Sequence, residues 1–190
     1  MATTLSAGDI AIIGFNFDNP DGLSFVLLTD ITSGTEIQFT DNGWQSSGEF
    51  RANEGTFTWT AASDLTKGTV ITPDVSGVAF SGSGDQIIAF QGSSDTPTFI
   101  YALNSEGSGV WQADATDSNT SALPTGLTNG ETAVALDEID NAVYSGTTSG
   151  TKQNYLQLLV IKTIGRAAIR NSKLFLLIVL QLMMVVPRLW

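Results

Sequence analysis

Short apolar and alternating segments separated by turn residues occupy most of the first 144 residues. Glu36–Asp41 (EIQFTD) and Thr56–Thr60 (TFTWT) alternate strictly, with Ile37 and Phe39, then Phe57 and Trp59, on one face. A period of two predicts half-buried β-strands. Compact apolar or alternating runs predict further strands at Asp9–Phe15, Leu23–Leu28, Thr69–Thr72, Gly77–Phe80, Gln86–Gln91, Thr98–Leu103, Thr132–Leu136 and Ala142–Tyr144.

Turn clusters separate these segments at short and fairly regular intervals. Asn19-Pro20-Asp21-Gly22 and Asn42-Gly43 supply residues that favour turns, and Asp114–Pro124 is the longest polar stretch. No amphipathic helix is evident before residue 152. The pattern therefore predicts an all-β, antiparallel sandwich or barrel, with a surface loop at Asp114–Pro124.

The chain changes character after Lys152. Nineteen acids and three basic residues give residues 1–152 a net charge of −16, whereas residues 153–190 hold five basic residues and no acid. Leu174–Val186 is apolar over 13 residues apart from Gln181. A membrane-spanning helix needs about 20 apolar residues, so this run is a marginal anchor.

Two interpretations of residues 153–190 follow. A shift of one base near the Lys152 codon permits a frame with acids, polar turns and an Asn-Lys-Asp-Asn-Trp segment, which resembles the preceding composition. We therefore predict a domain at 1–152 and a frameshift product at 153–190, poorly packed against it. The alternative is a tail-anchored protein, in which residues 174–186 associate with a membrane.

Composition excludes several classes of site. The chain contains no Cys and no His, which rules out disulfides, thiolate catalysis, Ser-His-Asp triads and histidine-ligated metals. The negative charge argues against nucleic-acid binding, because affinity for phosphates comes largely from Lys and Arg. We predict no catalytic residue. A carboxylate-based extracellular hydrolase, or an accessory domain of one, is the alternative, with Glu49 and Glu54 as the nearest pair.

Acidic turns are candidate cation sites. Asp18, Asp21 and Asp41 lie in or beside turns, and their oxygens are the ligands that Ca²⁺ prefers. The other interpretation is that these side chains form hydrogen bonds to the backbone of their own turns. Trp44 and Trp111 are candidate stacking platforms for a ligand such as a surface glycan, although each could equally plug one end of the sandwich.

Seven segments, in order, carry a resemblance to a known kind of module: AGDIAIIGFNFDNPDGLSFVLLTDI, FTDNGW, EGTFTWTA, GDQIIAFQG, PTFIYALN, ALPTGLTNGETAVAL and DNAVYSGTTSGTK. Over about residues 7–152 the chain resembles a β-sandwich module of large bacterial exoproteins, found beside Calx-β, cadherin-like, RTX-type or hydrolase domains. Its opening pattern also looks like the lamin-tail-type immunoglobulin-like sandwich.

The resemblance implies an immunoglobulin-like β-sandwich and a non-catalytic structural or adhesive role. It implies an extracellular or cell-surface location, with other domains of a larger exoprotein as partners, and a surface glycan or protein as a further candidate partner. Calcium is the candidate stabilising ion.

Overall fold

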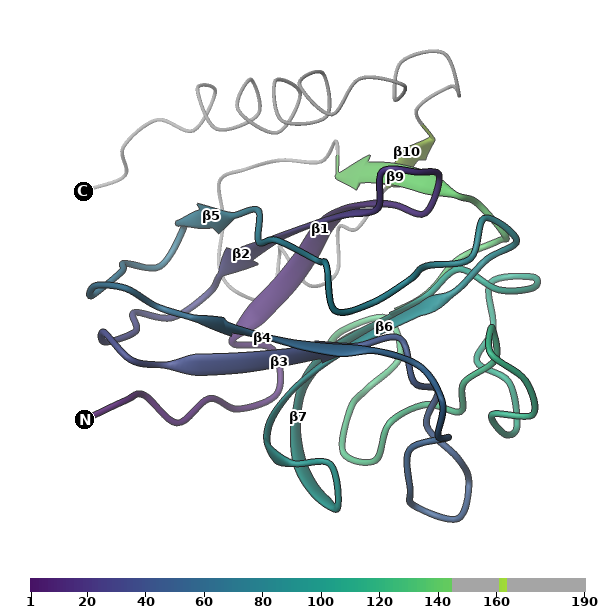
Figure 1. Ribbon diagram of the computed structural model, residues 1–190, viewed down its shortest axis with the longest axis horizontal. Helices are drawn as coiled ribbons and strands as arrows, with labels where there is room; N and C mark the ends of the chain where they lie inside the picture. Colours follow the sequence, from purple (N-terminus) through teal and green to yellow (C-terminus); the bar gives the residue numbers. More distant parts are fainter. Residues whose placement is uncertain (145–160, 164–190) are drawn as a thin grey trace.

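The computed structural model describes residues 1–144 and 161–163. Within them, ten β-strands form two sheets that lie face to face (Figure 1). The strands are β1 (Ile10–Asn16), β2 (Gly22–Leu27), β3 (Glu36–Thr40), β4 (Thr56–Thr60), β5 (Val70–Ile71), β6 (Gln86–Ser93), β7 (Thr96–Asn104), β8 (Ala133–Ala135), β9 (Asn141–Tyr144) and β10 (Ile161–Thr163).

The predicted all-β sandwich is confirmed. One sheet has the order β10-β9-β1-β2-β5 and the other β4-β3-β6-β7-β8. Neighbouring strands are antiparallel except β7 and β8, which run parallel and so depart from the predicted purely antiparallel pairing. β10 lies in the segment expected to be a poorly packed tail, yet it pairs with β9. The remaining predictions for residues 145–160 and 164–190 lie outside the described residues.

One predicted strand is absent from the described structure. Gly77–Phe80 forms an irregular connection between β5 and β6. Ala79 and Phe80 N–H bind side chains and Val78 N–H binds the Val75 carbonyl, so these groups do not pair with a neighbouring strand. The other predicted segments contain strands, with Thr69–Thr72 reduced to the two residues of β5. Asp114–Pro124 is a loop as predicted.

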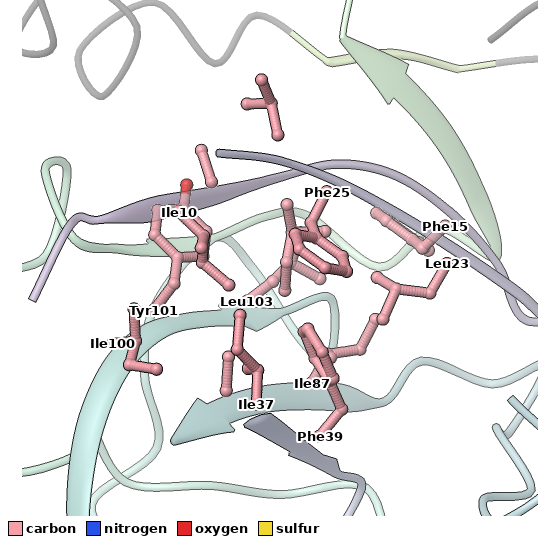
Figure 2. Packing of buried hydrophobic residues seen from close by; sticks show 14 of the residues in the cluster. Ile10, Phe15, Leu23, Phe25, Ile37, Phe39, Ile87, Ile100, Tyr101 and Leu103 are labelled. Carbon is pink, nitrogen blue, oxygen red and sulfur yellow. The ribbon is translucent and has the colours of Figure 1, made fainter. Parts of the chain in front are cut away.

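The main core lies between the sheets. Alternate residues of each strand point inward, so Phe25 of β2 meets Phe39 of β3 with ring centroids 5.1 Å apart. Figure 2 shows Ile10, Phe15 and Leu23 facing Ile37, Ile87 and Leu103 from the opposite sheet. Trp59 packs on the same core, edge-on to Phe25, as its place in the alternation predicts.

A second, smaller core covers the outer face of the second sheet. Outward-facing Ile88, Phe90 and Phe99 pack against Trp44 and Phe50 of the β3–β4 loop and against residues of the 105–132 segment. A bulge in β7 makes this possible: Tyr101 pairs with Ala89 and Phe99 pairs with Phe90, which leaves Ile100 as an extra residue. Among the described residues, no helix has the length and apolar character to cross a membrane.

Tyr101 offers a test of the core. Its side chain is fully buried, and its hydroxyl has no hydrogen-bond partner within the described structure (Figure 2). Because an unsatisfied buried hydroxyl costs about 1–3 kcal/mol, we expect Tyr101→Phe to raise the free energy of unfolding by about 1 kcal/mol. Tyr101→Ala should lower it by about 3–5 kcal/mol by leaving a cavity. Urea denaturation measures both, and a destabilised Tyr101→Phe protein would contradict this account.

Candidate functional site

Three carboxylates hold three consecutive backbone amides at one end of the sandwich. Ala79 N–H donates to Asp41 Oδ2 at 3.1 Å, Phe80 N–H to Asp21 Oδ2 at 3.0 Å, and Ser81 N–H to Asp85 Oδ2 at 2.7 Å. Asp21 precedes β2 in the first sheet, whereas Asp41 follows β3 and Asp85 precedes β6 in the second. We call this arrangement the amide clasp. It joins both sheets through the 79–81 segment.

Asp41 extends the amide clasp to a second loop. Its Oδ1 accepts a hydrogen bond from Gly55 N–H at 2.6 Å, so one carboxylate binds two separate backbone segments. Gly55 lies so close to Gly77 that an added Cβ would approach the Gly77 carbonyl oxygen to 2.1 Å. Only glycine fits where the backbone at residue 55 passes the backbone at residue 77, which explains why Gly55 occupies the turn before β4.

Burial raises the pKa of every carboxyl group in the amide clasp. Desolvation is the largest cause for Asp21, Asp41 and Asp85, and backbone hydrogen bonds oppose it. The pKa of Asp85 rises to about 8, with further contributions from the charges of Asp41 and Glu54. At neutral pH the Asp85 carboxyl therefore retains its proton in a substantial fraction of molecules.

Glu54 lies beside the amide clasp and belongs to the same electrostatic group. Desolvation and the neighbouring Asp41 charge raise its pKa to about 7, against the lowering effect of Arg51. Arg51 Nη1 lies 3.5 Å from Glu54 Oε1, while Glu54 Oε2 is buried without a hydrogen-bond partner. This is the one ion pair among the described residues, and it leaves the group rich in carboxylates and poor in cations.

The structure brings two of the three predicted calcium ligands together. Asp21 and Asp41 bind adjacent amides, and the Asp41 charge contributes to the raised pKa of Asp21. Asp18 instead accepts a hydrogen bond from Asn141 Nδ2 at 3.0 Å. Asp21 Oδ1 is buried without a hydrogen-bond partner, so one ligand oxygen is free. No three acidic side chains of the described residues converge as a ready metal site.

The two predicted stacking tryptophans belong to the second core. Trp44 is 6% exposed and packs edge-on against Phe50 and Phe99, so its ring faces no solvent groove. Trp111 is half-buried, and its Nε1–H donates to Asn129 Oδ1 at 3.1 Å. Of the pair, Trp111 alone keeps a partly accessible ring.

A hollow of about 630 Å³ lies on the outer face of the second sheet. Its lining includes Glu49 and Arg51 of the β3–β4 loop and Asp95 of the β6–β7 turn. Glu54, the proposed partner of Glu49 in the hydrolase alternative, is not among the lining residues, so this hollow does not hold both carboxylates.

Sequence analysis missed Asp85, which is buried at the centre of the acidic group. The sequence feature that could have identified Asp85 is its position directly before the buried strand Gln86–Gln91. There its two carboxylate oxygens accept hydrogen bonds from Ser81 N–H and Gln86 N–H.

Comparison with known proteins gives no relative. No protein-family model, no curated protein and no solved structure matches this chain.

Glu54 predicts a specific pH dependence of stability. Because its pKa is higher in the folded than in the unfolded protein, the folded state holds the proton more tightly. The contribution of Glu54 to the free energy of unfolding therefore falls as pH rises from about 4.5 through about 7 and is constant above that, while Asp85, whose pKa is raised to about 8, continues to lower the total. Glu54→Gln carries no such proton, so we expect it to match the parent near pH 4.5. At about pH 9 the free energy of unfolding of Glu54→Gln should exceed that of the parent by about 1–3 kcal/mol, reduced by the small contribution of the lost Arg51–Glu54 ion pair.

Urea denaturation across this pH range measures the difference. Glu131→Gln, which changes an exposed acid, should keep a constant offset from the parent protein. A constant offset for Glu54→Gln as well would contradict the assigned environment of Glu54.

Proposed function

We propose that this chain is a non-catalytic structural or adhesive module of a secreted or cell-surface protein. The proposal rests on the hydrogen bonds of the amide clasp, in which Asp21, Asp41 and Asp85 attach the 79–81 segment to the two sheets. Carboxylates that accept backbone hydrogen bonds are committed to holding the fold. This arrangement suits a rigid domain that presents loops at one end.

The proposed location and neighbouring domains are inferred from the sequence. The resemblance of residues 7–152 to modules of large bacterial exoproteins supports neighbouring domains in a longer polypeptide, and the net charge of −16 over residues 1–152 supports a partner other than nucleic acid. Membrane association would require residues 174–186 to be a genuine anchor.

A turnover assay tests the non-catalytic role. We expect the full chain to release p-nitrophenol from p-nitrophenyl glycosides and esters no faster than buffer does, because Glu54 does not line the hollow that Glu49 lines. Glu49→Gln and Glu54→Gln should leave the background rate unchanged. A rate above background that either substitution abolishes would establish the hydrolase alternative instead.

Calcium stabilisation is the second element of the proposal. The free Asp21 Oδ1, with Asp41 bound to the adjacent amide, supplies oxygens of the type that Ca²⁺ prefers. Asp18 would contribute if it exchanged its bond to Asn141 for the ion.

A thermal denaturation series tests this element. Extracellular modules bind Ca²⁺ with dissociation constants of about 10⁻⁴–10⁻³ M, so about 10 mM CaCl₂ should raise Tm by roughly 3–10 °C. Asp21→Asn should abolish the shift, whereas Glu131→Gln should keep it. An equal Tm shift in Asp21→Asn would place the ion elsewhere, and no shift in the parent protein would remove calcium from the proposal.

A further inference from the structure

The hollow on the outer face of the second sheet has a rigid floor. Thr40 and Thr56 lie on its floor, and their hydroxyls bond to each other at 2.9 Å. Thr40 Oγ1–H donates to the Gly55 carbonyl, which is also the alternative acceptor for Thr56 Oγ1–H at 2.8 Å. Asn42 Nδ2 donates to Thr40 Oγ1 and to the same carbonyl. These groups form hydrogen bonds with one another, so they shape the hollow but are not available to a ligand. Recognition of a ligand would therefore depend on the other lining residues.

The lining carries unpaired negative charge. Glu49 and Asp95 both line the hollow and are exposed, and neither side chain has a hydrogen bond or an ion pair within the described residues. Arg51, the positive group of the lining, is already paired with Glu54, whose Oε1 lies 3.5 Å from Arg51 Nη1. An occupant of the hollow therefore meets two free carboxylates and little compensating charge.

The hollow also has an apolar component. Phe50 is half-buried and packs on Phe90, with ring centroids 5.2 Å apart, and edge-on to Trp44 at 5.1 Å. Both phenylalanines belong to the lining. The second core thus fixes the ring of Phe50 beside the two carboxylates. In Figure 1 the β3–β4 loop and the β6–β7 turn project from the face of the second sheet that points away from the first.

We propose that this hollow binds a cationic group carried on an apolar stem, namely a lysine or arginine side chain of a partner polypeptide. The carboxylates of Glu49 and Asp95 would contact the charged head, and the phenyl ring of Phe50 the methylene stem. The strong negative charge of the domain attracts such a partner and repels an anionic one. The inference rests on the proposed adhesive role and specifies its ligand.

The test uses the ¹⁵N-labelled full chain titrated with the peptide acetyl-Gly-Arg-Gly-amide. We expect chemical-shift changes at residues 48–52 and at Ser94 and Asp95, and none of comparable size with the citrulline peptide, which has the same shape without the charge. The double variant Glu49→Gln/Asp95→Asn should weaken binding about tenfold, because two charge-assisted contacts are lost.

A matched control separates local recognition from net charge. Glu36→Gln/Glu131→Gln removes the same charge from exposed positions outside the hollow and should bind the peptide as the parent does. Raising the ionic strength should weaken binding in the parent and in this control.

Three outcomes would overturn the site. They are equal weakening in both double variants, binding of the citrulline peptide as tight as that of the arginine peptide, and shifts at residues 48–52 with cellotetraose but not with the arginine peptide. None of these would produce substrate turnover, so failure of this site is distinguishable from failure of the non-catalytic proposal, which the p-nitrophenol assay decides.

Discussion

The binding of three consecutive amides by three carboxylates is the constraint on which this end of the sandwich depends. The 79–81 segment connects β5 of the first sheet to β6 of the second, and its N–H groups have no strand to pair with. N–H groups shielded from water need acceptors, and Asp21, Asp41 and Asp85 supply them to this partly buried segment from both sheets. The amide clasp thereby closes the end of the main core.

This solution has an electrostatic cost. Each carboxylate leaves water for a site with few cations, so desolvation raises its pKa, while the amide hydrogen bonds act in the opposite direction. Burial raises the pKa of Glu54 to about 7 and that of Asp85 to about 8, so the charge of this group changes near neutral pH. Stability and protonation are linked at this end of the domain.

The second core determines what the outer face presents. Without the β3–β4 loop, Phe90 and Phe99 would lie exposed on the second sheet. Trp44 and Phe50 cover them, and the same loop lines the hollow. The aromatic residues that the sequence suggested as ligand platforms pack in this second core. The carboxylates of Glu49 and Asp95 remain without side-chain partners within the described residues.

Most of the strands could be predicted from local pattern, because alternation such as that of Glu36–Asp41 and Thr56–Thr60 is a property of neighbouring residues that packing preserved. The composition alone gives the chemical character of the domain, acidic and without Cys or His. Packing between distant segments prevents Gly77–Phe80 from forming a strand, since Ala79 and Phe80 N–H meet acceptors distant in the chain. It likewise decided that Asp21 and Asp41 converge while Asp18 turns to Asn141, and that Asp85 is buried among them. These outcomes depend on contacts between residues tens of positions apart, which local pattern does not encode.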